Sequence, residues 1–532
     1  MLLPSLAWVS VDRSVWPWDQ AWYGEVSINL WSTLRLHSGD WLSLMTNAFG
    51  SKPPAVAWLG QFFVPIGYRL DHVEVALLVS VVLCQILSVA LVYAAVRRLT
   101  HSLLAAVCAA VTLAGAPLFT ALSHEYLADP IATLAVCWML FVMASAHKWR
   151  FGVLLTQMLS AMAFGLLSKL STPLFMAAPV AATLLIAWRN RQPRGNHAGF
   201  PRDRGFILST AAAGVLSLAA FGWYRNNLGL ALEHARTVNS TLWGRELPYT
   251  TQLEFWSRAL LNATFLPYFA ILVATVIGVA ILASIRGNSF HLRVPSPDIT
   301  CLLACLATVT AVTLVVSRQV AQETRYILPL VAILALCVGI VVGRSRHRVA
   351  GIAILVLVSL QFAASTAQSF GATLKPLAYA RIRAPVNDRF YQTLEQIVTS
   401  TCTLKANYRI SVVGVDYPWL NANTLSLLAD ETFGLRDRQC HYTPLGLAEQ
   451  DSERAFQRLL TFKPPYYISL DYDNPNNPLS QAKSSSIVAS DLFNTINRDV
   501  HRRVLGSGLF EILPGSRRDG IVILRARDTT AS

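Results

Sequence analysis

Ten long apolar runs, separated by polar segments, constrain the fold of this chain more than any other sequence feature. Runs of this length are long enough, or nearly long enough, to cross a bilayer as helices. Hydrophobic residues make up 54% of the 532 residues and charged residues only 14%, which is too apolar for a soluble protein of this size. The sequence therefore predicts a polytopic α-helical membrane protein. The runs cover residues 73–96, 103–122, 131–146, 151–167, 174–188, 206–223, 265–284, 299–316, 327–343 and 349–368.

The charges between these runs predict their orientation. If successive runs alternate in direction, one set of connecting segments collects most of the cations, and the positive-inside rule makes that set cytoplasmic. The net charge of +14 is then largely topological and does not indicate nucleic-acid binding. The cytoplasmic set contains Arg97, Arg98, Lys148, Arg150, Arg189, Arg191, Arg194, Arg202, Arg204, Arg286, Arg293, Arg344, Arg346 and Arg348. The outer set comprises residues 124–130, 168–172, 224–264 and 317–326, together with both ends of the chain.

The last third of the chain has a different pattern. Its apolar runs are short and are separated by polar turns, which predicts a small water-soluble α/β domain on the outer side. We expect two domains, a transmembrane domain with outer-face loops at 1–372 and an extramembrane domain at 373–532. Strands are expected at 409–415, 466–471, 509–513 and 520–525, and helices at 390–399 and 424–429.

Cys402 and Cys440 are the two cysteines that lie in polar sequence. In an oxidising compartment they could form a disulfide, and two free thiols are the alternative. The chain contains no CxxC, HExxH or GxxxxGK[ST] motif, so the common zinc signatures and the ATP-binding loop are absent. No cofactor is assigned, and the use of a divalent metal ion is left open.

Charged residues of both signs gather on the predicted outer side of the membrane. Charge at or near bilayer depth is costly, so such a cluster is a functional-site hypothesis. A lipid-borne substrate that contains a phosphate would need both cations and a carboxylate base. The cluster consists of Asp19, Lys52, Glu125, Asp129, Lys169, Arg225, Arg318, Glu323 and Arg325.

Each member also has a purely structural interpretation. Asp19 lies in WPWDQAWYGEVSINLW, which could be an aromatic belt at the membrane surface, and Asp129 before Pro130 could cap a helix. The lysines and arginines could be anchors at the membrane interface. The functional hypothesis depends on the convergence of these charges on one side and not on any single residue.

Six segments, in order, resemble the GT-C glycosyltransferases of the protein mannosyltransferase and aminoarabinose lipid A transferase group, which are similar to glycosyltransferase family 39. They are PWDQAWYGEVS around Asp19, KPP at 52–54, LADP at 127–130, LLSKLST at 166–172, WYRNN at 223–227 and ETRYILPLVAILAL at 323–336. The resemblance covers roughly the first two thirds of the chain. It implies a GT-C fold with the active site in the outer loops.

The resemblance also implies residue roles. Asp19 would be the catalytic aspartate and Asp129 the second catalytic acid, while Lys52 and Arg225 would bind the donor phosphate. The charges on the outer side add Arg325 to the predicted phosphate-binding residues. Glu25, Glu125, Lys169 and Tyr326 are candidate substrate-binding residues. Two departures from the family pattern stand out. Gln20 replaces an acid, which weakens metal binding by paired acids. No apolar run precedes Asp19, and the two alternatives are that the start codon was assigned too late or that a first transmembrane helix is missing.

The function that we predict is transfer of a sugar from a polyprenyl-phosphate donor to a glycan, lipid or protein acceptor. The reaction would invert the anomeric centre, with Asp19 as general base, at the outer face of what we expect to be a bacterial inner membrane. One alternative is a transporter or flippase of lipid-linked saccharides, which should place its binding groups near the bilayer midplane. Another is a catalytically inactive scaffold of the same family.

Overall fold

The computed structural model describes most of the chain. The described residues are 3–190, 204–239, 246–286, 296–345, 348–373, 377–388, 390–402, 409–433, 440–445, 449, 451–474, 476–477, 479 and 488–527. Several of the arginines assigned above to the cytoplasmic loops, including Arg191, Arg194, Arg202, Arg293 and Arg346, lie outside these residues.

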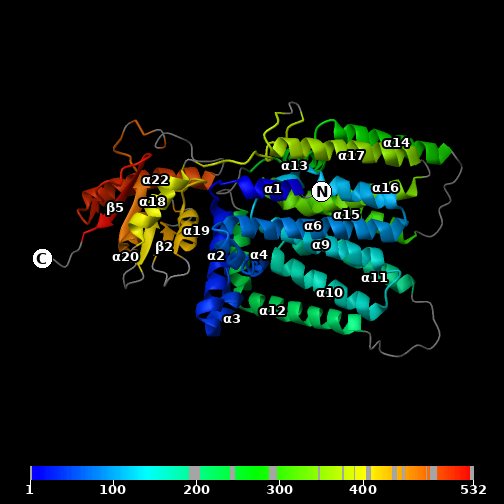
Figure 1. Cartoon of the computed structure of the whole chain (residues 1–532), viewed down its shortest axis with the longest axis horizontal. Coiled ribbons are helices and arrows are strands. Elements are labelled where there is room, and N and C mark those ends of the chain that lie inside the picture. Colours follow the sequence, from blue (N-terminus) through cyan, green and yellow to red (C-terminus); the bar gives the residue numbers. More distant parts are fainter. Residues whose placement is uncertain are drawn as a thin grey trace.

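A bundle of long helices forms the larger part of the molecule, and its members run roughly parallel or antiparallel to one another (Figure 1). Eight helices in the described part of the chain are long and apolar enough to cross a membrane, so the chain is an integral membrane protein. They are α6 (Val73–Thr100), α9 (Ala128–Ser145), α10 (Phe151–Ser168), α11 (Thr172–Arg189), α12 (Arg204–Val238), α15 (Pro297–Val316), α16 (Leu328–Arg344) with the preceding η1 (Thr324–Ile327), and α17 (Arg348–Ser369).

The predicted run at 103–122 is not a single helix, which corrects the sequence prediction. It is divided into α7 (Leu103–Ala114) and α8 (Pro117–Leu122). Gly115 follows α7 and packs against the backbone of Phe362, and Pro117 begins α8, where its fixed backbone angle suits a helix start. The run at 265–284 also differs from a simple span, because α13 (Tyr249–Thr264) and α14 (Phe269–Arg286) meet at an angle of 87°.

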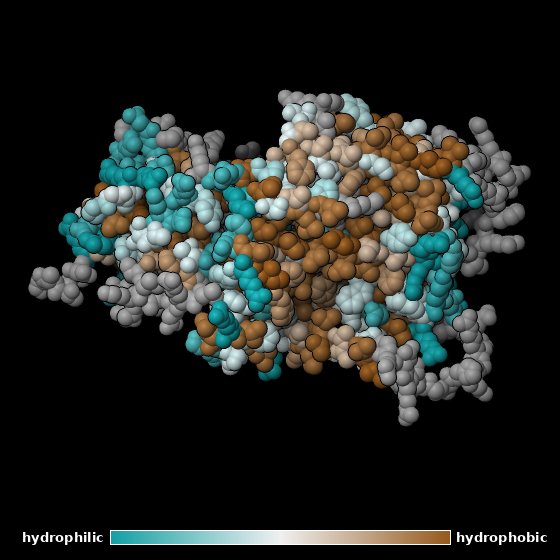
Figure 2. Space-filling view, in the orientation of Figure 1, coloured by the Kyte–Doolittle hydropathy of each residue, from teal (hydrophilic) through white to brown (hydrophobic). Residues whose placement is uncertain are grey.

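The surface of the bundle has the character expected of a membrane protein. Figure 2 shows hydrophobic residues spread over the helices, with hydrophilic residues gathered on the flanks and on the C-terminal part. On α12, for example, Leu208, Val215, Leu218 and Phe221 are all exposed. Apolar side chains in such numbers on an outward face are stable in contact with lipid and not with water.

Five further helices precede or flank the bundle at one end: α1 (Leu3–Val11), α2 (Trp18–Leu36), α3 (Ser38–Asn47), α4 (Ala55–Gly60) and α5 (Val64–Arg69). Figure 1 shows α2 crossing the ends of the bundle helices, between the bundle and the C-terminal sheet. Helix α2 packs on one side against α4 and on the other against α19 (Ala422–Phe433). It therefore lies at the junction between the two parts of the molecule.

The C-terminal part is built on a five-stranded sheet with the order β2-β1-β3-β5-β4. Strand β1 (Arg409–Val413) is parallel to β2 (Cys440–Pro444) and β3 (Tyr466–Leu470), whereas β5 (Ile521–Ala526) is antiparallel to β3 and to β4 (Phe510–Ile512). One face buries side chains of α18 (Tyr391–Thr401) and α19, and the other buries those of α20 (Ser452–Phe462) and α22 (Val488–Gly506). The expected fold class is confirmed, although β2, α20 and α22 were not predicted.

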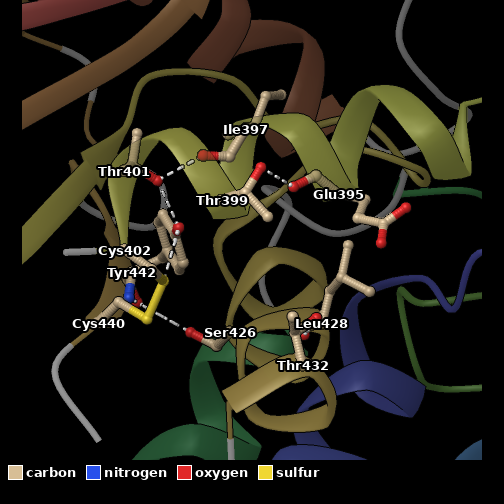
Figure 3. Close-up of a disulfide and its surroundings, with 10 residues drawn as sticks. All are labelled: Glu395, Ile397, Thr399, Thr401, Cys402, Ser426, Leu428, Thr432, Cys440 and Tyr442. Atoms are coloured by element: carbon tan, nitrogen blue, oxygen red, sulfur yellow. Dashed lines mark hydrogen bonds between the residues drawn. A yellow bond between two sulfur atoms is a disulfide. The ribbon is translucent and has the colours of Figure 1, made fainter. Parts of the chain in front are cut away.

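A disulfide joins Cys402, directly after α18, to Cys440, the first residue of β2. Their Cα atoms lie 5.1 Å apart, and 38 residues separate them in sequence. Figure 3 shows Tyr442 beside this bridge, with its hydroxyl 2.6 Å from the Thr401 hydroxyl. The disulfide fastens α18 to an edge strand of the sheet.

Candidate functional site

Asp19 lies in the first turn of α2, where the helix dipole favours a negative charge. Pro17 precedes the helix in an extended conformation and makes no side-chain capping bond. Trp18, the first helical residue, has a φ of 23°, a backbone conformation that residues other than glycine rarely adopt. The chain therefore bends sharply into α2 immediately before Asp19.

Two cations from distant segments hold the Asp19 carboxylate. Lys52 Nζ lies 2.6 Å from Oδ1, and Arg325 Nη2 lies 2.9 Å from Oδ2. The side chain of Asp19 is 30% exposed, and those of Lys52 and Arg325 are 15% and 17% exposed. Because this site is largely shielded from water but still open, it can support strong electrostatic interactions with an incoming charged group.

The charge state of Asp19 follows from these neighbours. Burial alone would raise the pKa of the Asp19 carboxyl, but Lys52 and then Arg325 outweigh it and hold that pKa well below its ordinary value. Asp19 is therefore a carboxylate at neutral pH. It is also a weak base for as long as both cations remain on it, because a group with a depressed pKa binds a proton poorly.

A second ion pair lies beside the first. Asp129, in the first turn of α9, contacts Lys169 Nζ at 2.5 Å, and its side chain is only 5% exposed. Lys169 follows the last residue of α10, so this pair joins the ends of two neighbouring antiparallel helices. Burial lowers the pKa of the Lys169 ammonium below its ordinary value, and Arg325 adds to this, although Asp129 opposes it.

Tyr326 connects the two ion pairs. Its ring centroid lies 4.2 Å from Lys169 Nζ and 5.6 Å from the guanidinium carbon of Arg325. On the opposite side, Lys52 Nζ lies 4.8 Å from the ring of Trp22 and 5.6 Å from that of Tyr23. Aromatic faces stabilise partly desolvated cations, so these rings keep the cations in place at the site.

A chain of alternating charges extends from Asp19 toward the C-terminal part. Arg325 Nε lies 3.7 Å from Glu323, and Arg381 lies 3.8 Å from the same carboxylate oxygen. Arg381 also donates two hydrogen bonds to Glu125, of 2.9 Å from Nε and 2.6 Å from Nη2. Sequence reasoning included Glu125 and missed Arg381. This arginine lies beyond the last membrane helix. Charged residues are common in water-soluble segments, so its presence there did not mark it as functional.

The structure thus brings together Asp19, Lys52, Asp129, Lys169, Arg325 and Tyr326, all predicted from the sequence. Two other predicted residues lie apart from them. Arg225 is exposed on α12 and forms no ion pair with any described residue. Glu25 is buried on α2 and lies 3.5 Å from Nδ1 of His441 on β2.

Sequence reasoning also missed His234, near the end of α12. This side chain is close enough to Lys52 and Asp19 for both charges to act on it. The signal available in the sequence was weak, because His234 lies in the polar extension of a helix whose apolar run ends at Trp223. Among the described residues, no three His, Cys, Asp or Glu side chains converge in a way that could hold a metal ion.

Comparison with known proteins identifies the fold in which these residues lie. Residues 51–198, which include Lys52, Asp129 and Lys169, match the model of the dolichyl-phosphate-mannose-protein mannosyltransferase family. Over 99% of this chain, the structure is similar to that of ArnT from Cupriavidus metallidurans bound to undecaprenyl phosphate. The match has a TM-score of 0.59 and 15% sequence identity and covers 97% of the ArnT chain.

The chain has a GT-C glycosyltransferase fold. The structure of the same ArnT in the apo state gives a consistent match, with a TM-score of 0.55 and 14% identity over 98% of this chain and 95% of that one. No curated protein sequence matches the chain closely enough to be counted as a relative. The resemblance to the GT-C glycosyltransferases inferred from the six sequence segments is therefore confirmed, and it extends beyond those segments to the C-terminal part of the chain.

Proposed function

We propose that this protein is a membrane glycosyltransferase that takes a sugar from a polyprenyl-phosphate donor and transfers it to an acceptor hydroxyl beside Asp19. The proposal rests on the two ion pairs that the Asp19 carboxylate forms, one with Lys52 and one with Arg325. A donor phosphate and a general base must lie within a few ångströms of each other on either side of an anomeric carbon. Two cations beside one carboxylate support that arrangement, because they could bind the phosphate next to the base.

The reaction that this geometry supports is a single displacement. The acceptor oxygen attacks the anomeric carbon, its proton passes to Asp19, and the bond between that carbon and the phosphate oxygen breaks. The lipid phosphate departs with the electron pair, and Lys52 and Arg325 neutralise its charge. One displacement at the anomeric carbon inverts its configuration.

The same cations would also control the strength of the base. With no donor present, Lys52 and Arg325 depress the pKa of the Asp19 carboxyl despite its burial. A bound phosphate would share both cations and so weaken their hold on Asp19, which would raise its basicity at the moment when the donor is in place. Asp129, held by Lys169, would orient the acceptor on the neighbouring side of the site.

The position of the charges favours an enzyme over a transporter. Asp19, Lys52 and Lys169 lie outside the eight candidate spans, and Asp129 and Arg325 lie in the first turn of theirs. A transporter would instead be expected to place its binding groups on broken helices near the midplane. The structural relative was solved with undecaprenyl phosphate bound, which supports a polyprenyl phosphate as the lipid part of the donor.

The test is a transfer assay with the full chain in lipid nanodiscs. Radiolabelled undecaprenyl-phosphate sugars would be supplied together with glycan, lipid and peptide acceptors, and both the released lipid phosphate and the glycosylated product would be measured. We expect the two to appear in equal amounts, with NMR of the product showing an inverted anomeric centre. Movement of the intact donor across proteoliposome membranes without any product would contradict the proposal and support a transporter.

The identity of the sugar can be found in parallel. Mass spectrometry of lipid extracts from cells that lack this protein should reveal the lipid-linked sugar that accumulates when its consumer is absent. That sugar is then the first donor to be tested in nanodiscs. An unchanged lipid profile, together with no transfer from any donor in the panel, would favour an inactive scaffold.

A further inference from the structure

The C-terminal sheet contacts the residue that precedes Asp19. The indole Nε1 of Trp18 donates a hydrogen bond of 2.7 Å to Oδ1 of Asp416. Asp416 follows strand β1 of the sheet, and 398 residues separate it from Trp18 in sequence. A hydrogen bond to a carboxylate is short and strong compared with one between neutral groups, so this contact can hold a side chain in place.

Asp416 is itself fixed by helix α22. Its backbone N–H donates to Oδ1 of Asn494 at 3.0 Å, and Nδ2 of Asn494 donates to its backbone carbonyl at 3.3 Å. Two further hydrogen bonds, from helix α19, hold the backbone at the start of α2. Asn423 donates to the carbonyl of Trp18 at 3.4 Å, and the hydroxyl of Thr424 donates to the carbonyl of Trp16 at 2.9 Å.

The conformation of Trp18 shows why such a hold is needed. Its φ of 23° is strained for a residue with a side chain, and strained backbone persists only where the surroundings enforce it. The bond to Asp416 holds the Trp18 side chain, while the contacts from α19 hold only backbone carbonyls, so loss of this bond would favour relaxation of Trp18 toward an ordinary helical or extended conformation. Because Asp19 is the next residue, relaxation at Trp18 would turn the Asp19 carboxylate away from Lys52 and Arg325.

We propose that Asp416 is a positioning residue for the transfer reaction. By accepting the hydrogen bond from Trp18, it fixes the first turn of α2 and with it the direction of the Asp19 carboxylate. This inference rests on the role proposed above for Asp19 as the general base. It gives the C-terminal sheet a defined part in catalysis, because Asp416 acts on Asp19 through Trp18.

Four variants test the inference in nanodiscs: Asp416→Ala, Asp416→Asn, Trp18→Phe and the double variant Trp18→Phe/Asp416→Ala. We expect Asp416→Ala and Trp18→Phe each to lower kcat by about tenfold to a hundredfold, since a small misplacement of a reacting group has an effect of that size. The KM for the donor should change little, because the phosphate-binding cations remain. The double variant should lose no more activity than either single variant.

Asp416→Asn distinguishes position from charge, because the amide retains an oxygen that accepts the Trp18 hydrogen bond. We expect it to keep most of the wild-type kcat. The matched control is Asp473→Ala, which removes an exposed acid of the same sheet region that pairs with Arg517 at 3.3 Å. That control should leave kcat unchanged.

Hydrogen–deuterium exchange provides a readout that does not depend on activity. Peptides covering residues 18–28 should exchange faster in Asp416→Ala than in the wild type, and at the wild-type rate in Asp416→Asn and Asp473→Ala. Wild-type kcat and exchange in Asp416→Ala would overturn the inference. So would an Asp416→Asn variant as impaired as Asp416→Ala.

Asp19→Asn, assayed alongside, separates the two proposals. If Asp19→Asn is inactive while Asp416→Ala turns over normally, the positioning inference alone fails. If Asp19→Asn transfers sugar at the wild-type rate, the proposed role of Asp19 fails, and a positioning role toward it fails as well. The exchange data then show only whether Asp416 fixes the start of α2.

Discussion

Both ends of the helical bundle are rich in cations, but the cations have different surroundings at the two ends. At the end where α2 crosses the bundle, Lys52, Lys169 and Arg325 each contact a carboxylate within 3 Å and are mostly shielded from water. At the other end, Arg97, Lys148, Arg150 and Arg189 are exposed. The ion pair described there, between Arg344 and Asp298, leaves the arginine side chain 43% exposed.

This difference separates two uses of positive charge in one membrane protein. Exposed cations interact weakly with any single partner because water and salt screen them, but together they set orientation during insertion. Partly buried cations interact strongly with the carboxylates that they contact, and a newly bound anion can compete for those interactions. If the proposed function holds, the same residue types determine topology at one end of the bundle and take part in chemistry at the other.

The largest expected difference between the two ends is their accessibility from the two sides of the membrane. A cysteine introduced at Gln322, which is exposed near Arg325, should react with an impermeant thiol reagent added to intact cells. A cysteine introduced at His101, exposed after α6, should react only after the membrane is opened.

The native cysteines that the structure describes should not react with the thiol reagent. The six free cysteines that the structure describes are buried, and Cys402 and Cys440 are joined to each other. The reverse labelling pattern would place Asp19 and the C-terminal sheet in the cytoplasm. An outer-face transferase would then have to be replaced by an enzyme that works at the cytoplasmic face.

Removing one carboxylate at each end tests whether the chemistry is confined to the α2 end. Asp19→Asn should lower kcat by about a hundredfold to ten-thousandfold, the usual effect of losing a general base. Donor affinity should be retained, because Lys52 and Arg325 lose a competing carboxylate. Asp298→Asn, which breaks the ion pair to Arg344, is the matched control and should turn over normally. Normal turnover in Asp19→Asn would remove this residue from the mechanism.

Removing cations should have a smaller effect, seen first in binding. Lys52→Ala and Arg325→Gln should each weaken binding of undecaprenyl phosphate by about tenfold to a hundredfold, since a charge-assisted hydrogen bond contributes roughly 1.5–3 kcal/mol. Titration of the lipid into nanodiscs measures this directly. Arg344→Gln at the opposite end should leave the affinity unchanged.

Arg225→Ala distinguishes the hypothesis based on sequence from the site seen in the structure. The family resemblance assigns the donor phosphate to Arg225, whereas the structure leaves this side chain exposed on α12. If the phosphate lies between Lys52 and Arg325, Arg225→Ala should bind the lipid nearly as well as the wild type. A loss equal to that of Lys52→Ala would return Arg225 to the binding site.

Much of the α2 end could be predicted because charge near a bilayer is rare and costly. That cost singled out Asp19, Lys52, Asp129, Lys169 and Arg325, and the alternation of the apolar runs placed them on one side. Their pairing could not be predicted. Which lysine meets which aspartate depends on how helices far apart in sequence pack, and Arg325 joins Asp19 across 306 residues.

The parts that were missed lie where this signal is absent. Arg381 and Asp416 belong to the segment after the last membrane helix, where charged residues are ordinary and carry no information about burial. Strand β2, with the sequence CHYTP, has only five residues and ends in a proline, which is uncommon inside strands. It is held by parallel pairing with β1 and by the disulfide at Cys440.

The smallest expected effect is a shift in pH dependence that comes from Lys169. Burial, with Arg325 adding to it, lowers the pKa of this ammonium, and Asp129 only partly compensates. A cation with a lowered pKa is charged below that pKa and loses its proton as the pH rises through it. If transfer needs a charged Lys169 to hold Asp129, then kcat/KM should fall as the pH rises. The fall should begin at a lower pH than it would for a lysine with an ordinary pKa.

Lys169→Arg tests this directly, because arginine stays charged throughout the accessible pH range. The variant should be a few-fold less active near neutrality, since the guanidinium cannot reproduce the 2.5 Å contact to Asp129, but its alkaline limb should move to higher pH. Lys148→Arg, an exposed lysine at the other end, should leave the profile unchanged. Titration of Asp19 should not lower kcat/KM near neutral pH, because its cationic neighbours keep its pKa low despite burial.

Superimposable alkaline limbs in the wild type and Lys169→Arg would show that the charge of Lys169 does not control the reaction. The two ends of the bundle would then differ at Asp19 and its cations alone.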